Sequence, residues 1–277
     1  MIYLEQIPNA QLSQYIDKLW YCQADSFANK TLVIPLLHHE LIFNFSDYHC
    51  ISRNPEFETV ALKNPTSWIS GIQTAPTIVE SKGKHKMMGV LFKPNGLKRF
   101  TKYHSKEFEN SHVEAELIFG NPLNSLIDQL HAKREVKDKF NIIQNFLTAH
   151  LMNDTVPHYL NESLKHFSAQ TQSRISIKTT SSKVLTTNKS LINSFQKHIG
   201  VTPIKYLRLQ SINAAIKLLT EDPLQSYTNL ANELNFYDQA HFINAFKQVT
   251  GLTPTQYSRY VLSDHVDKSS SNFIQLW

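Results

Sequence analysis

Histidine and glutamate side chains near residue 40 are the residues of this sequence that could hold a metal ion. His38, His39 and Glu40 are consecutive, and His85 follows in a later apolar segment. Metal sites in small β-barrels need ligands that alternate along strands and converge, whereas neighbouring residues of a strand point to opposite faces. Only one of His38 and His39 could therefore point inward. Ordinary strand and turn histidines are the competing interpretation.

Other catalytic chemistry finds little support. The two cysteines, Cys22 and Cys50, have no histidine partner at a recognisable spacing, and they fit reduced, buried thiols. The sequence contains no phosphate-binding glycine loop, no nucleophile elbow and no paired-carboxylate signature. We therefore expect no catalysis and no cofactor. The alternative that stays open is a cupin-type metalloenzyme with an appended helical domain.

The composition is that of a globular protein with material for two cores. The chain has 277 residues, of which 41% are hydrophobic and 18% are charged. It has no apolar run near the roughly 20 residues that span a bilayer. The first residues place Glu5 where a signal peptide would carry a basic and then an apolar stretch. These features favour a cytoplasmic protein that has no membrane partner.

The positive charge is concentrated in one segment. Residues 1–169 carry 17 Lys and Arg against 17 Asp and Glu, whereas residues 170–260 carry 10 against 4. A basic segment attracts polyanions, and nucleic acid is the commonest polyanion in a cytosol. The alternative is a solvated basic face on ordinary helices.

The first 93 residues predict a small β-barrel or sandwich. Short runs of branched and aromatic residues are separated by Pro, Gly and Asn; they lie at 31–35, 40–45, 59–62, 67–71, 77–81 and 86–92. The basic run at 81–86 is most simply a hairpin turn. A helix is expected at 95–105. Residues 121–151 predict two helices broken near 132–136, whose apolar stripe is either core or a dimer seam.

An internal repeat is the most informative feature of the sequence. "GVTPIKY" at 200–206 returns as "GLTPTQY" at 251–257, a period of 51 residues. The repeat also pairs Phe195 with Phe246, Gly200 with Gly251, Thr202 with Thr253, Pro203 with Pro254 and Tyr206 with Tyr257. Each glycine is expected to end a helix, and each Thr-Pro pair is expected to begin the next one.

Each copy of the repeat predicts a helix-turn-helix. In the second copy, residues 227–235 form the leading helix, and Asp238 caps a helix whose inner stripe is Phe242, Phe246 and Val249. Asn235 occupies the turn, where a left-handed residue is needed. The first copy has helices at 176–185 and 189–199, and a long helix at 203–219 joins the copies. Two second helices held about 34 Å apart can enter successive major grooves of DNA.

The expected strands and helices together predict an α+β fold class, with a β-rich domain followed by an all-α domain.

The second copy, "NFYDQAHFINAFKQVTGLTPTQYS", resembles a motif in the DNA-binding domain of the AraC/XylS family of bacterial transcription regulators. The resemblance to that domain covers about residues 155–260. The segments "VIPLLHHELIFNF", "SGIQTAP" and "GVLFKPNGLKRF" are similar to a β-rich, cupin-like group of sensor domains. The resemblance implies a sensor and dimerisation domain at 1–152, a DNA-binding domain at 153–262 and a loose tail at 263–277. It also implies double-stranded DNA as the partner. A small-molecule effector, RNA polymerase and a second copy of the chain are further possible partners.

The resemblance also implies which residues face DNA. The base-facing set would be Lys189, Ile192 and Asn193 in the first unit, and Gln239, Ala240, Ile243 and Asn244 in the second; Lys197, Lys205 and Lys247 would lie nearer phosphates. Family members commonly carry arginine where this chain has Asn193 and Asn244, glycine in place of Asn235 and serine in place of Ala240. Asparagine can bond adenine and an apolar side chain can contact the thymine methyl, so one hypothesis is an A·T-rich operator. The alternative is that Lys189 and Gln239 carry the specificity.

Overall fold

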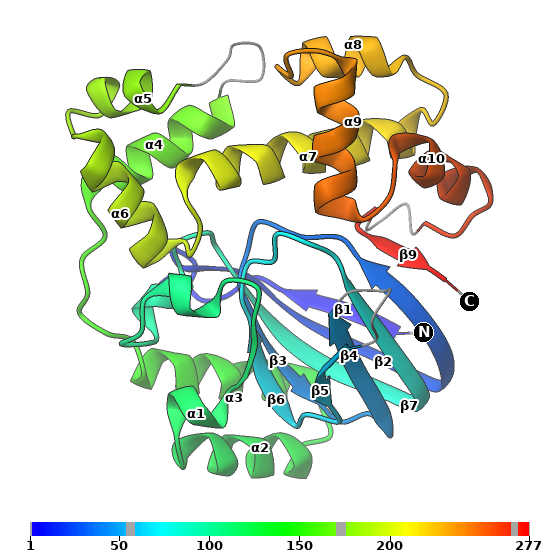
Figure 1. Cartoon of the computed structure of the whole chain (residues 1–277). Coiled ribbons are helices and arrows are strands. Elements are labelled where there is room, and N and C mark those ends of the chain that lie inside the picture. Colours follow the sequence, from blue (N-terminus) through cyan, green and yellow to red (C-terminus); the bar gives the residue numbers. More distant parts are fainter. Residues whose placement is uncertain (1, 54–58, 170–175, 267–270, 277) are drawn as a thin grey trace.

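The computed structural model describes residues 2–53, 59–169, 176–266 and 271–276. A curved antiparallel sheet with helices α1–α3 beneath it forms one layer, and helices α4–α10 form a second layer above it (Figure 1). The strands are β1 (Ile2–Gln6), β2 (Ile16–Val33), β3 (Glu40–Asn44), β4 (Tyr48–Arg53), β5 (Thr59–Lys63), β6 (Ser67–Ser70), β7 (Thr77–Phe92), β8 (His112–Glu114) and β9 (Phe273–Gln275).

Two long strands, β2 and β7, form the spine of the sheet. They pair antiparallel from Ile16 opposite Phe92 to Val33 opposite Thr77. On its other side, β7 pairs with β4 over residues 77–82 and with β3 over residues 87–91. The main path of the sheet runs β1-β2-β7-β3-β6-β8. Strand β1 pairs with residues 19–23 of β2, and β9 pairs with residues 31–33 of the same strand.

The hairpin turn expected at 81–86 is wrong, because these residues lie inside β7. The two strands expected at 77–81 and 86–92 are halves of this one strand. Gly83 takes a positive φ of 81°, and the register with β2 shifts opposite it, between Ala24 and Phe27. A bulge of this kind absorbs the irregularity while the pairing continues on both sides. The sequence showed the glycine and the lysines but not the neighbouring strand that holds them extended.

The helix expected at 95–105 is also wrong. This segment contains the short 3₁₀ turn η1 (Leu97–Arg99), and a second 3₁₀ turn, η2 (Ser105–Phe108), begins at its last residue. The break expected near 132–136 is confirmed, since α1 (Glu116–Phe119) is followed by α2 (Pro122–Ala132) and α3 (Val136–Ala149). The apolar stripe of α2 and α3 packs against the sheet residues Leu41, Phe43, Met88 and Val90, so the stripe is core.

The second layer contains seven helices among the described residues. They are α4 (His158–Ala169), α5 (Ile177–Lys183), α6 (Asn188–His198), α7 (Pro203–Glu221), α8 (Tyr227–Glu233), α9 (Gln239–Thr250) and α10 (Pro254–Leu262). The expected fold class, a β-rich domain followed by an all-α domain, is confirmed. The cupin-like detail stays a prediction.

The loose tail expected at 263–277 is contradicted over its described residues. Strand β9 pairs with residues 31–33 of β2, and Ile274 is fully buried. The Tyr257 hydroxyl also donates to the Ser271 carbonyl at 2.9 Å. The polar residues before β9 suggested a free tail, but an apolar side chain and an uncovered sheet edge are enough to fix its end. Residues 267–270 and 277 of the expected tail lie outside the described part of the chain.

Candidate nucleic-acid interface

The two helix-turn-helix units are built with matching caps. In each unit one side-chain oxygen at the start of every helix accepts a hydrogen bond from the backbone N–H three residues later; the cap pairs are Ser176 and Ser226, Thr187 and Asp238, and Thr202 and Thr253. Such caps satisfy N–H groups that have no partner within the helix. Gly200 and Gly251 follow the second helices with φ of 102° and 75°. The caps expected from the repeat are therefore confirmed.

The two turns differ by one residue. The leading helices α5 and α8 start 50 residues apart, whereas the second helices α6 and α9 start 51 apart. The left-handed position is Leu185 in the first turn, with φ of 55°, and Asn235 in the second, with φ of 62°. The expectation for Asn235 is confirmed. Leu185 has no intrinsic preference for this conformation and is 93% exposed, so the first turn is the less favourable of the two.

The leading helix of the first unit compensates for its poor helix propensity with hydroxyl hydrogen bonds. Thr180 and Ser181 are buried in α5. The Thr180 hydroxyl donates to the Ser176 carbonyl at 3.0 Å, and the Ser181 hydroxyl donates to the Asn188 side chain in α6. In the second unit the corresponding position is the buried Ala231. Both arrangements let the second helix cross the leading helix closely.

The second unit exposes most of the residues that the resemblance implies. On α9, Gln239, Ala240, Asn244 and Lys247 are exposed and Ile243 is partly buried. The neighbouring Phe242 and Phe246 are fully buried, as their spacing predicts. The Gln239 side-chain oxygen accepts a hydrogen bond from the Thr228 hydroxyl at 2.8 Å.

The first unit presents the same three-residue pattern. Leu191 is buried, Ile192 is partly buried and Asn193 is exposed, in the same order as Phe242, Ile243 and Asn244. Lys189, one turn earlier on α6, is also exposed. The structure thus turns both asparagines outward on the second helices of the two units.

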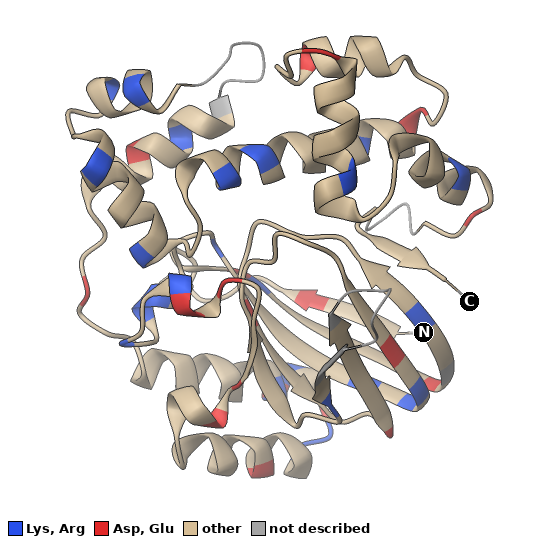
Figure 2. Cartoon of the chain, viewed as in Figure 1, with Lys and Arg blue, Asp and Glu red and all other residues tan. Residues whose placement is uncertain are grey.

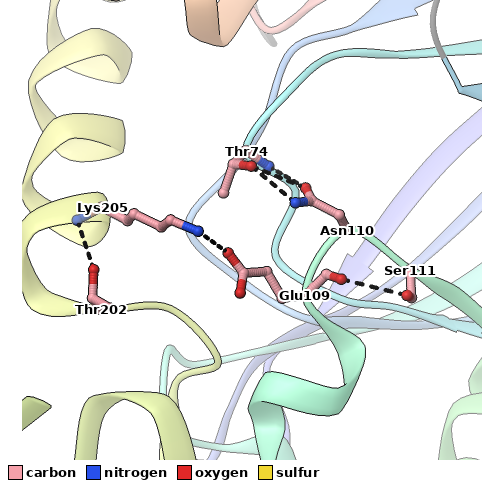
Figure 3. A network of polar contacts seen from close by, with 6 residues as sticks. All are labelled: Thr74, Glu109, Asn110, Ser111, Thr202 and Lys205. Carbon is pink, nitrogen blue, oxygen red and sulfur yellow. Dashed lines mark hydrogen bonds and ion pairs between the residues drawn. The ribbon is translucent and has the colours of Figure 1, made fainter.

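Two of the lysines that the resemblance places near phosphates form ion pairs at the boundary with the β-rich domain. The Lys205 ammonium is 2.6 Å from the Glu109 carboxylate, which follows η2 (Figure 3). The Lys197 ammonium is 3.9 Å from Asp154, and Asp154 also holds the buried Lys98 at 3.0 Å. Sequence reasoning missed both acidic partners, because each is far from its lysine in sequence and belongs to no motif.

Polar contacts fix the end of α6 to the β-rich domain. The His39 Nε2 atom lies 2.9 Å from the Ile199 carbonyl, and the Ser105 hydroxyl donates to the His198 carbonyl at 3.0 Å. A β-carbon on Gly200 would lie only 2.8 Å from the Ser105 carbonyl oxygen. The first unit therefore packs against η2 with no room for a side chain at this point.

His39 makes a structural contact between the two layers. Burial lowers its pKa to about 4, although the bond to the Ile199 carbonyl acts in the opposite direction. The neutral ring donates that bond from Nε2. Within the described ranges no three His, Cys, Asp or Glu residues lie where they could hold a metal ion together. No helix among these residues is long and apolar enough to cross a membrane.

The charge asymmetry of the sequence is visible in the second layer. Figure 2 shows Lys and Arg recurring along α5, α6, α7, α9 and α10, with Asp and Glu sparse there. Positive side chains on this layer create a field that attracts a polyanion to the helices that carry the exposed asparagines.

Comparison with known proteins gives one family match in each of the two parts of the chain. Residues 181–260 match the family described as "Helix-turn-helix domain", and residues 4–114 match "Domain of unknown function (DUF6597)". A protein described as an uncharacterized HTH-type transcriptional regulator from Haemophilus influenzae is 35% identical over 72 residues, 26% of this chain and 24% of that protein. The chain thus spans about a quarter of the length of this relative.

One solved structure that the chain matches is ToxT from Vibrio cholerae, bound to (E)-4-(8-methylnaphthalen-1-yl)but-3-enoic acid. The TM-score is 0.49 and the identity 8%, and the match covers 87% of this chain and 99% of that chain. The C-terminal domain of AraT, a response regulator from Geobacillus stearothermophilus, has a TM-score of 0.36 and 19% identity, and covers 38% of this chain and 88% of that one.

Proposed function

We propose that this chain, whose residues 181–260 form an AraC-type helix-turn-helix domain, is a sequence-specific DNA-binding transcription regulator. The observation that carries the proposal is the duplication. Two helix-turn-helix units with matching caps each turn an asparagine outward from the second helix, at Asn193 and Asn244. An all-helical repeat used only for protein contacts would not need the same polar residue exposed in both copies.

The spacing of the units supports simultaneous contact with DNA. Helix α7 runs unbroken for 19 residues, which corresponds to about 28 Å, and the units lie at its two ends. One turn of DNA is about 34 Å long, so two helices held by α7 are of the right scale to enter successive major grooves on one face. In Figure 1, α6 lies near the start of α7, and α9 crosses α7 toward its other end.

We propose that Asn193 and Asn244 read adenine and that Ile192 and Ile243 contact thymine methyl groups. The asparagine amide N–H can donate to adenine N7 while its carbonyl oxygen accepts from the adenine N6 amino group, a bidentate contact worth about 1–3 kcal/mol of discrimination. Lys189, Gln239 and Ala240 complete the base-facing set. The Gln239 carbonyl oxygen is already bonded to Thr228, which leaves its amide N–H groups to act as donors. Lys247, Lys197 and Lys205 are proposed to contact phosphates.

A binding selection on random DNA tests both the function and the reading face. The wild-type chain is expected to return A·T-rich sites, and Asn193→Ala with Asn244→Ala is expected to relax the preference at two positions about one helical turn apart. Asn232→Ala, an exposed asparagine on the leading helix α8, is the matched control and should leave the selected sites unchanged. G·C-rich sites would refute the adenine reading. Unchanged sites in the double variant would refute the proposed face, and no selected site at all would refute the function.

The β-rich domain is proposed to sense a small-molecule effector or to dimerise, and the protein to act on RNA polymerase without performing chemistry itself. Two hollows of about 330 and 210 Å³ lie on the surface beside α2. A thermal-shift screen with small metabolites tests the effector. Metal analysis of the purified protein tests the alternative, since stoichiometric metal bound through His39 would favour a metalloenzyme.

A further inference from the structure

The larger of the two hollows beside α2 lies where the end of the sheet formed by β6 and β8 meets helices α1 and α2. Its volume is about 330 Å³. Small-molecule sites in proteins commonly occupy about 300–1,000 Å³, so the hollow has room for one small molecule. The described residues that line it include three with carboxylate side chains and no Lys, Arg or His.

The floor of the hollow is apolar. Ile127 of α2 is partly buried, and Leu123, one helical turn before it, is fully buried behind it. Both residues belong to the face of α2 that packs against the sheet. A ligand that covers Ile127 therefore needs a hydrocarbon part.

A buried hydroxyl lies at the strand side of the hollow. Ser67 of β6 is 6% exposed and shares a face of the strand with Ile69, which packs toward α2, whereas Trp68 lies on the opposite face. The Ser67 carbonyl accepts a bond from the Ala115 N–H at 3.1 Å, but the hydroxyl forms no hydrogen bond with any residue that the structure describes. A buried polar group without a partner costs free energy, so a ligand that supplies the partner is favoured.

The rim of the hollow is acidic. Glu116 of α1 and Asp128 of α2 are exposed, and neither forms an ion pair with a described residue. In contrast, Glu109 and Asp154 of the same part of the chain are each paired with lysine. Helices α1 and α2 contain no Lys or Arg, and Figure 2 shows an acidic segment on each. The hollow thus carries negative charge that no neighbouring cation compensates.

The polar groups of the lining accept hydrogen bonds more than they donate them. Carboxylate oxygens only accept, and the Asn124 side chain, which lies between the two acids, already donates to the Glu116 carboxylate at 2.9 Å. The Ser67 hydroxyl can accept as well as donate. A bare metal ion does not fit, because within the described ranges no three His, Cys, Asp or Glu residues lie where they could hold one together. The matching ligand brings N–H donors, positive charge and a hydrocarbon part.

We propose that this hollow binds a small organic cation, an alkylammonium or alkylguanidinium compound. Its N–H groups would bond Asp128, Glu116 and the Ser67 hydroxyl, and its hydrocarbon stem would cover Ile127. The inference rests on the sensing role proposed for the β-rich domain, which it narrows to one class of compound at one place.

Isothermal titration calorimetry of the full chain, without DNA, tests the binding. The wild type is expected to bind 1,4-diaminobutane or butylguanidine saturably, whereas butane-1,4-diol, which has the same length and no charge, should not bind. Asn124→Arg puts a guanidinium of the protein itself at the hollow and should abolish binding. Ser125→Arg adds the same charge to α2 at an exposed residue that does not line the hollow, and should preserve binding. Circular dichroism and thermal unfolding establish that both variants fold.

Charge removal tests the two acids separately. Asp128→Asn and Glu116→Gln keep the size of each side chain and should each weaken binding by about 1.5- to 5-fold, the range for one exposed ion pair. Asp138→Asn, at an exposed residue of α3 away from the hollow, is the control and should leave binding unchanged.

Three results would overturn the proposal: no saturable binding of either cation, binding that survives Asn124→Arg, or equal binding of the diol. None of them bears on DNA recognition, which the selection on random DNA measures separately. A chain that selects DNA sites but binds neither cation keeps the proposed DNA-binding function and loses this inference.

Discussion

Replacing Glu109 with glutamine should strengthen DNA binding. In the structure Glu109 of the β-rich domain holds the Lys205 ammonium at 2.6 Å, at the first turn of α7 (Figure 3). A phosphate group that is to be bound by Lys205 must first displace this carboxylate. Glu109→Gln keeps the size of the side chain and removes the charge, so Lys205 becomes available at lower cost.

The magnitude follows from the exposure of the pair. The Lys205 side chain is 52% exposed and the Glu109 side chain 17%, so water screens the attraction substantially. Ion pairs of this kind contribute about 0.2–1 kcal/mol. Because about 1.4 kcal/mol corresponds to a tenfold change in affinity, Glu109→Gln should tighten DNA binding by about 1.5- to 5-fold at most.

Fluorescence anisotropy with an operator obtained from the binding selection measures the effect. Lys205→Ala should weaken binding and make the slope of log affinity against log salt shallower by about 0.9, the share of one phosphate contact. In the Lys205→Ala background, Glu109→Gln should then have no effect, since the group that it frees is gone. Glu114→Gln removes an exposed negative charge elsewhere in the same domain and controls for net charge.

Two results would refute this reasoning. If Glu109→Gln leaves the affinity unchanged while Lys205→Ala weakens it, the carboxylate does not compete with DNA. If Lys205→Ala leaves both the affinity and its salt dependence unchanged, Lys205 contacts no phosphate.

Three further predictions concern stability. Burial raises the pKa of Glu40 to about 7 from an ordinary value of 4.5, against the Trp20 hydrogen bond, so the free energy of unfolding should fall as pH rises from about 4.5 to 7. Urea titrations should show Glu40→Gln flattening this decline. Gly200→Ala should cost about 2 kcal/mol or more, because φ is 102° and the β-carbon meets the Ser105 carbonyl; Gly251→Ala, with φ of 75°, should cost about 1 kcal/mol in the same titration. Truncation before residue 271 removes the buried Ile274 and should speed limited proteolysis between the two layers; unchanged proteolysis would show that β9 does not hold them together.

The helical layer could be predicted from the sequence because its signals are local. A cap, a helix-ending glycine or the stripe of Phe242 and Phe246 depends on residues within one or two turns. Self-comparison then gave the two units and the helix between them. The one-residue difference between the turns was hidden, since Leu185 carries none of the preference for a left-handed backbone that marks Asn235.

The β-rich layer was predicted less well because strand pairing is not local. Residues 81–86 have the composition of a turn, and only β2 and β4 alongside keep them extended within β7. The end of the chain looked loose for the same reason, since its partner is residues 31–33 at the opposite end of the sequence.

The sequence by itself determined the duplicated helix-turn-helix and the outward asparagines, since helical periodicity decides which side of a helix a residue occupies. Only the tertiary structure decided that Lys205 lies against Glu109, that the end of α6 rests on Ser105 and His39, and that β1 is left as an open edge. Each of these depends on segments far apart in the chain. Their approach is fixed by the packing of the two layers, which no short stretch of residues encodes.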